Sequence, residues 1–454
     1  MSATENNRAL DGAVIPTFFY YVVPSIIGLV ALTTATLVDG IFVGNGIGSD
    51  ALAAISIMMP WFTLLTAVSL MLAIGGSVRA GKYVGEDNLP AASAVFSKTL
   101  ITAALVNLLL AGFSLLAEPL LFAALNTPAE LQPAINAYFD VIRWVLVIQL
   151  TTMVLYYFVR ADGHPMLATV ALIVGATTNI VLDYWFIMIE GLGLQGAAIA
   201  TAIAQCLQLA VLCTYFVSRT RTLSFSLQQQ QWREMLYCAF NGVSEFINEI
   251  SVGLLFLLLN WLLIDSLGID GLAAFSVINY LIFLSIMLCY GVADALHLLV
   301  SQNFGARNFH RIKQFSYVAS ACVMALGVLI ITGLSIAKTA VIDLFLDVKA
   351  QHVAELAASI ALVVSPLFLV NGTNILISCY LTAIHQPRAS AMIALLRSLL
   401  LPAGLLVLFY FAVKHSTTLE NFHFLAALPA AEWMTFLIAV TIYCRHQHLE
   451  AADG

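Results

Sequence analysis

Charged side chains are scarce in this chain: Asp, Glu, Lys and Arg make up 9% of its 454 residues. Soluble domains carry about 25%. Hydrophobic residues account for 61% of the sequence, and the mean hydropathy is +0.96. The apolar runs are continuous and do not alternate with polar residues, which argues against an outer-membrane β-barrel. The composition therefore predicts an all-α integral membrane protein that crosses the bilayer many times.

The motifs of metal and catalytic chemistry are also missing. The seven cysteines are scattered singly, without a CxxC or Cys/His cluster, so we expect no disulfide framework and no metal site. No HExxH, GxSxG or paired-His motif is present, so we expect no enzyme and no cofactor. The net charge of −7 comes without a basic run, which argues against nucleic acid as a partner.

The apolar residues fall into segments long enough to cross about 30 Å of hydrocarbon as helices. The polar start, Met1 to Leu10, lacks the pattern of a cleaved signal, so we expect the first segment to be retained. The sequence predicts twelve transmembrane helices, over 13–43, 51–78, 92–117, 131–159, 165–189, 196–218, 234–264, 271–299, 312–337, 352–382, 388–413 and 422–444.

The two halves of the chain repeat. Ile47–Ala54 resembles Leu267–Ala274 at a shift of 220, and the same shift pairs Gly85–Asn88 with Gly305–Asn308. Each half then holds six helices and enters the membrane from the same side, as a parallel repeat with a pseudo-two-fold axis along the membrane normal. We expect an N-terminal six-helix bundle over 1–218, a polar cytoplasmic linker over 219–233 and a C-terminal bundle over 234–454.

The distribution of Lys and Arg predicts the orientation. With the N-terminus inside, the outer side receives only Lys338, Lys349 and Lys414, and Arg143 falls within the fourth segment. All other Lys and Arg then lie inside. By the positive-inside rule both termini are expected in the cytoplasm.

Polar residues within the apolar segments are the candidates for function, because a carboxylate in hydrocarbon is costly. Asp39 lies about one turn from the outer end of the first segment, and Asp183 about two turns from the outer end of the fifth. Asn179 shares the helical face of Asp183, and Thr201 of the sixth segment lies at a similar depth. We expect these four side chains to form one pocket.

Two buried carboxylates that lie close together cannot both be ionised without a large cost from desolvation and repulsion. Such a pair can hold a proton, a sodium ion or an organic cation, one at the expense of another, and this exchange is what an antiporter needs. Two simpler interpretations stay open. Asp39 could be a helix-end residue near water, and Asp183 with Asn179 could clamp two helices together.

Pro24 lies in the middle of the first segment, fifteen residues before Asp39. Proline removes a helix hydrogen bond and allows a kink. Gly28, one turn further on, adds freedom to bend. We therefore expect a hinge here that moves the pocket wall.

Together these features resemble the multidrug and toxic compound extrusion (MATE) family, in its DNA-damage-inducible-F-like prokaryotic branch. The most specific stretches are Asn179–Asp183 and Gly191–Thr201, and the likeness covers nearly the whole chain. The resemblance implies that Asp39, Asn179, Asp183 and Thr201 form a cation site. It also implies that Pro24 is the bending proline of the first helix.

The second half departs from the family pattern. Other branches use acidic residues in helices seven and ten. Helix seven carries Glu245, Asn248 and Glu249 here, but helix ten has Asn371 and Asn374 and no acid. We keep the three helix-seven residues as secondary candidates, with a solvated role equally open.

The resemblance implies a secondary active efflux transporter of the bacterial inner membrane, working as a monomer among membrane lipids. It would export amphipathic organic cations in exchange for protons, or for sodium bound by the same four residues. The alternative is a lipid-linked precursor flippase of the same superfamily. A flippase would need basic residues for a pyrophosphate, and Arg143 is the only Lys or Arg well inside a first-half segment.

Overall fold

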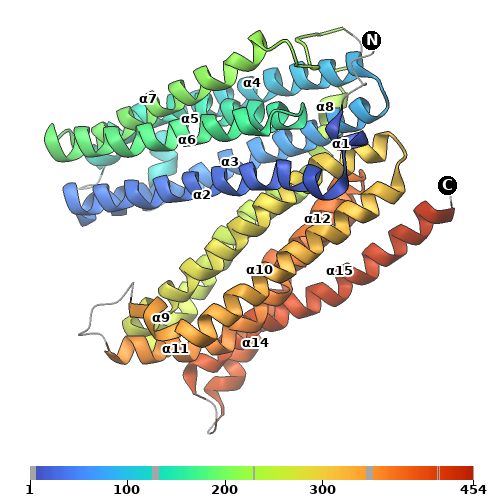
Figure 1. Cartoon of the computed structure of the whole chain (residues 1–454). Coiled ribbons are helices and arrows are strands. Elements are labelled where there is room, and N and C mark those ends of the chain that lie inside the picture. Colours follow the sequence, from blue (N-terminus) through green and yellow to red (C-terminus); the bar gives the residue numbers. More distant parts are fainter. Residues whose placement is uncertain are drawn as a thin grey trace. The chain divides into compact units, whose positions relative to one another are not determined.

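The computed structural model describes residues 7–124, 132–228, 231–343, 351–416, 418 and 420–452. Within these ranges the chain is almost entirely helical and contains no strand (Figure 1).

The chain begins with helices that include both long crossings and two short elements. They are α1 (Arg8–Asp11), α2 (Val14–Gly46), α3 (Ser49–Gly85), α4 (Leu89–Ala124), α5 (Gln132–Ala161), α6 (Pro165–Asp183), the π-helix η1 (Tyr184–Ile189), α7 (Gly193–Cys213), the 3₁₀ turn η2 (Thr214–Val217) and α8 (Glu234–Asn241).

The later helices are more often interrupted. They are α9 (Val243–Gly305), α10 (Phe309–Asp343), α11 (Gln351–Val364), η3 (Ser365–Leu369), α12 (Asn371–Ala383), α13 (Pro387–Leu395), η4 (Leu396–Leu400), α14 (Leu401–Lys414), η5 (Asn421–Ala426) and α15 (Ala427–Ala452).

The 63-residue element α9 is two crossings joined end to end. Gly268 breaks it with φ 67° and ψ −159°, a left-handed conformation that glycine adopts without a steric penalty. The described residues contain eleven apolar helical stretches long enough to span a bilayer, one of which is α9. Counting α9 twice gives twelve crossings, as predicted from the sequence.

The repeat is visible in the backbone as well as in the sequence. Left-handed φ values recur in the loops that the shift of about 220 pairs: Gly48 (120°) with Gly268 (67°), Asp87 (58°) with Arg307 (54°), and Gly163 (84°) with His385 (59°). Matching turns at matching positions show that the two halves use the same chain path between their helices.

The chain divides into two compact units. Unit 1 comprises Met1–Phe246 and Ser301–Asn308, and unit 2 comprises Ile247–Val300 and Phe309–Gly454. These units follow packing, whereas the boundaries at 218 and 234 follow the repeat and stay a prediction. Each unit has its own apolar core.

The helix predicted over 234–264 starts as a separate short helix, α8, and the crossing begins only at Val243. Two glycines explain the break, because they let α8 lie against α3. A Cβ on Gly75 would come within 1.9 Å of the Cys238 carbonyl oxygen, and one on Gly242 within 2.0 Å of the Met71 carbonyl oxygen. An ion pair of 2.6 Å from Arg79 Nε to Glu234 Oε1 closes the same contact.

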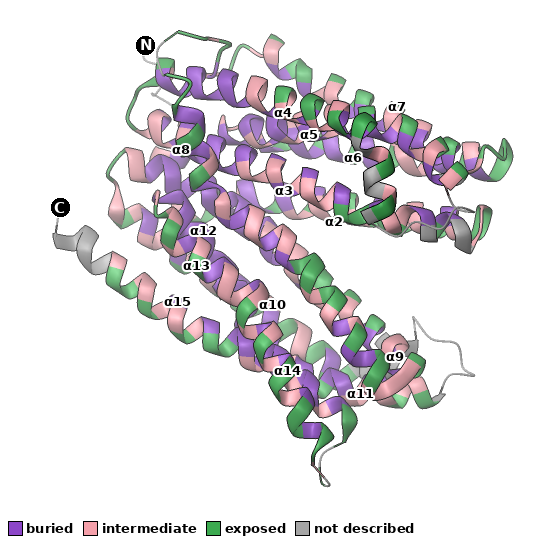
Figure 2. Cartoon of the chain, turned by 180° about the vertical axis from the view of Figure 1, so that it is seen from behind, coloured by how far each residue is buried: buried purple, intermediate pink, exposed green. Residues whose placement is uncertain are grey.

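Large apolar side chains are exposed along the helices and not only in loops. Leu109 and Leu116 of α4 are 71% and 84% exposed, and Ile336 of α10 is 83% exposed. Figure 2 shows exposed and half-buried residues along the lengths of helices in both units. Such surfaces are stable in contact with lipid, so the chain is a multi-pass membrane protein.

Candidate functional site

Helix α6 positions the predicted site, because it packs against both α2 and α7 within unit 1. Asp39 lies on α2, Asn179 and Asp183 lie on successive turns of α6, and Thr201 lies on α7. The structure thus places all four predicted residues on three neighbouring helices.

Asp39 and Asp183 meet between α2 and α6, with their carboxyl groups within hydrogen-bonding reach of each other. Asp183 is fully buried, and Asp39 is half-buried. No donor on the described part of the chain reaches either carboxyl oxygen of Asp183. An ionised carboxylate only accepts hydrogen bonds. The contact therefore becomes a hydrogen bond only when one of the two groups carries a proton.

Asn179 and Thr201 form a second pair beside the first. The Asn179 amide Nδ2 lies 3.4 Å from Thr201 Oγ1, which donates to the Ala197 carbonyl oxygen at 3.0 Å. Neither side chain donates to Asp183. The four residues are therefore arranged as two pairs, which α6 connects through its Asn179 and Asp183 turns.

Tyr138 of α5 belongs to this region and was not predicted. It lies close enough to Asp39 and Asp183 for their charges to act on its hydroxyl. Its ring centre is 6.3 Å from that of Phe62. Nothing in the sequence separates it from the other tyrosines, because only the fold brings α5 beside the carboxylates.

The helix geometry changes directly after Asp183. The π-helix η1 begins at Tyr184, so the backbone widens at the residue that follows the buried carboxylate. Short π-helical turns within α-helices are frequent at functional sites. No sequence signal predicted this change.

The predicted hinge residues both face α6. Pro24 is buried within α2, and its carbonyl oxygen accepts a 2.7 Å hydrogen bond from Thr169 Oγ1. A Cβ on Gly28 would lie 2.8 Å from Leu172 Cδ1, so the glycine permits close packing here. The helix α2 is continuous through Pro24. Thr169 was not predicted as part of this region.

The secondary candidates do not gather as the first four do. Glu245 is buried and belongs to unit 1, whereas Asn248 and Glu249 belong to unit 2. Asn248 Oδ1 accepts a 3.3 Å hydrogen bond from Ser398 Oγ, and Glu249 is half-buried.

Unit 2 contains a buried ion pair that the sequence did not reveal. Arg397 Nε lies 3.1 Å from Glu432 Oε1. Asn374 Nδ2 donates to Glu432 Oε2 at 2.6 Å and to the Glu432 carbonyl oxygen at 2.8 Å. The available signal was one acidic and one basic residue, each alone within an apolar segment. Here the opposite charges are matched, unlike at Asp39 and Asp183.

A comparison with known families decides the identity. The MatE family model matches the chain twice, over residues 24–185 and 246–407. The chain belongs to the MatE family. The two matches of this MatE chain begin 222 residues apart, which agrees with the internal repeat.

Relatives of this MatE chain include two named multidrug export protein MepA. The one from Staphylococcus aureus (strain NCTC 8325 / PS 47) is 24% identical over 389 residues, which is 85% of each chain. The one from Staphylococcus haemolyticus (strain JCSC1435) is 22% identical over 400 residues, which is 88% of each.

Solved structures share the fold of the MatE chain. A MATE protein in complex with MaL6 superposes with a TM-score of 0.92 at 22% identity, over 99% of this chain and 100% of that one. A MOP superfamily transporter from Pyrococcus furiosus gives 0.89 at 22% identity, over 99% of both chains. These likenesses confirm the twelve-helix fold.

The Arg397–Glu432 pair should be needed for stability. Arg397→Met leaves Glu432 buried without its cation, which costs about 3–5 kcal/mol. We expect a clear loss of thermal stability in detergent, largely recovered in the double variant Arg397→Met/Glu432→Gln. Arg388→Met removes an exposed arginine near the start of the same crossing and should be neutral. Wild-type stability of the single variant would contradict this account.

Proposed function

We propose that this MatE chain is a secondary active transporter that exports amphipathic organic cations in exchange for an inward-moving cation, with H⁺ favoured over Na⁺. The MepA relatives are named multidrug export proteins, which supports efflux as the activity. We place the protein in the bacterial inner membrane as a monomer, with both termini in the cytoplasm. The observation that carries the proposal is the contact between Asp39 and Asp183.

The pair explains how ion and substrate could be exchanged. When neither carboxyl is protonated, two negative charges lie together without a donor on Asp183, and a bound cation would relieve the repulsion. When a proton enters, the two groups hold each other and their attraction for an organic cation falls. A ligand shifts a conformational equilibrium only through such a difference in affinity.

The geometry favours a proton over sodium as the coupling ion. Sodium would need several oxygen ligands at once, by analogy with other hard cations. Asn179 and Thr201 are engaged with each other, and the Thr201 hydroxyl also bonds Ala197. A proton needs only the two carboxyl groups.

Pro24 supplies the proposed motion. Bending of α2 at Pro24 would carry Asp39 relative to α6 and alternate the access of the pocket between the two sides of the membrane. The missing helix hydrogen bond at the proline lowers the cost of the bend.

The flippase alternative is less well supported. Its cavity would need a free basic side chain for a pyrophosphate, and Arg143 was the candidate. Arg143 is buried and already bonded, at 2.7 Å to Glu118 Oε2 and 2.9 Å to Asp140 Oδ1. Its charge is therefore already compensated.

The carboxylate pair can be tested by growth. Asp39→Asn and Asp183→Asn each remove one ionisable group at nearly constant volume, so resistance to a cationic dye such as ethidium should fall to the level of cells without the transporter. Expression should stay near normal, as checked by immunoblot. Glu190→Gln, which changes an exposed carboxylate just beyond η1, should keep full resistance. Full resistance in both Asp variants would rule out the site.

The hinge can be tested by separating binding from transport. Pro24→Ala restores a backbone N–H and should stiffen α2, so efflux should fall at least several-fold while dye binding to the purified protein stays near wild type. Pro119→Ala changes an exposed helical proline of α4 and serves as the matched control. If Pro24→Ala transports like the wild type, the proline has only an architectural role.

The coupling ion can be tested in everted membrane vesicles with independently imposed gradients. A pH gradient alone should drive dye uptake in the absence of sodium, and an ionophore that collapses the gradient should stop it. Uptake that requires sodium and ignores the pH gradient would show that the coupling ion is not a proton. The Asp39 and Asp183 variants would then still test the site independently.

A further inference from the structure

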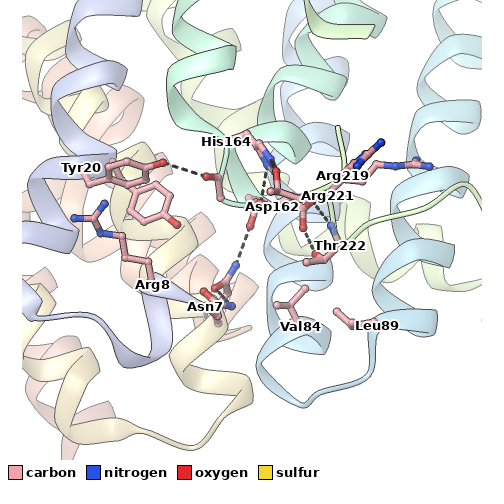
Figure 3. A pocket seen from close by; sticks show the side chains of 15 residues that line it. Asn7, Arg8, Tyr20, Val84, Leu89, Asp162, His164, Arg219, Arg221 and Thr222 are labelled. Atoms are coloured by element: carbon pink, nitrogen blue, oxygen red, sulfur yellow. Dashed lines mark hydrogen bonds between the residues drawn. The ribbon is translucent and has the colours of Figure 1, made fainter. Parts of the chain in front are cut away.

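A cavity of about 580 Å³ opens at one end of unit 1, away from the carboxylate pair (Figure 3). Its walls come from the N-terminal segment, the start of α2, the turn between α5 and α6 and the chain after η2. Tyr21 in this wall precedes Asp39 by 18 residues on α2, a distance of about 27 Å along the helix. The cavity is therefore separate from the proposed ion site.

The charged residues around the cavity are mostly positive. Arg8, Arg219 and Arg221 line it, and none of them forms an ion pair with another described residue. The Arg8 guanidinium lies 4.3 Å from the centre of the Tyr20 ring, a contact that leaves its N–H donors usable. Figure 3 shows Arg8 on one side of Asp162, with Arg219 and Arg221 on the other.

The single lining carboxylate, Asp162, is already occupied by donors of the protein. Its Oδ2 accepts from the Tyr215 hydroxyl at 2.6 Å and from the Thr222 backbone N–H at 2.7 Å. The Thr222 hydroxyl bonds its other oxygen. These bonds hold the chain that carries Arg219 and Arg221, and they leave a net positive charge to act on a ligand.

Tyr21 gives a second, independent indication of a ligand. Its side chain is only 2% exposed and lines the cavity, yet its hydroxyl has no hydrogen-bond partner among the described residues. The neighbouring frame is fully bonded: Asn7 Nδ2 donates to Gln302 Oε1 at 3.1 Å, and Gln302 Nε2 donates to the Ala161 carbonyl at 2.8 Å. A hydroxyl donor thus stays available within a fixed wall.

We propose that this cavity binds a phosphate group. Guanidinium groups match phosphate oxygens in geometry and charge, and the Tyr21 hydroxyl adds a neutral donor. The volume lies within the range of small-ligand sites. The cations flank the cavity on two sides, which suits a phosphate that carries a further group.

Two sources could supply this phosphate. The lining residues lie where helices begin or end, at the level of lipid headgroups, and basic pockets between transmembrane helices at the cytoplasmic surface bind anionic headgroups. A soluble phosphate compound would use the same donors. The chemistry of recognition is shared, so the source is a matter for experiment.

The test has two arms with purified full-length protein. In the first, inorganic phosphate is titrated by calorimetry in a neutral detergent at constant ionic strength. In the second, native mass spectrometry compares retention of phosphatidylglycerol with that of phosphatidylcholine of the same acyl chains. The variants are Arg8→Gln, Arg221→Gln and Tyr21→Phe. Arg233→Gln, an exposed arginine of the same linker that does not line the cavity, is the matched control.

We expect binding in at least one arm, weakened about tenfold by Arg8→Gln or Arg221→Gln and about fivefold by Tyr21→Phe. Arg233→Gln should bind like the wild type. A response to phosphatidylglycerol alone assigns the site to a lipid headgroup, and a response to inorganic phosphate assigns it to a soluble ligand. No binding in either arm, or equal weakening by Arg233→Gln, would overturn the proposal.

Discussion

The structure depends on one constraint: a polar side chain within the hydrocarbon must find its partner inside the protein. Arg143 meets this constraint with Glu118, and Arg397 meets it with Glu432. Asp39 and Asp183 do not, because two groups of the same charge face each other and Asp183 has no donor on the described chain. Saturated pairs hold helices together, whereas an unsaturated pair can take up and release an ion.

The fold could be predicted from the sequence because hydropathy alone determines where a helix must cross a bilayer. The repeat could also be predicted, since its conserved turns carry short motifs such as Leu267–Ala274. The short helix α8 could not. Its separation from α9 depends on the contact of Gly242 with Met71, and a contact between distant residues leaves no local pattern.

The site was predictable to the same degree and for a similar reason. Asp39 and Asp183 stand out because acidic residues are rare in apolar segments, and helix depth was enough to place them together. Depth could not show that Asn179 would bond Thr201 and leave the carboxylates alone. Tyr138 and Thr169 are ordinary residues of their helices, and only packing gives them a place beside the site. In the same way, Arg8 and Arg221 meet one cavity from positions far apart in the chain.

The contact of Thr169 with the Pro24 carbonyl limits how α2 can move. Pro24 and Asp39 are 15 residues apart on α2, and their partners Thr169 and Asp183 are 14 residues apart on α6. The two helices therefore run parallel and in register over about 21 Å. An axial slide of α2 would break both contacts at once. A pivot at the proline keeps the Thr169 bond and displaces only the carboxylate end, so α6 serves as a fixed rail against which the far half of α2 swings.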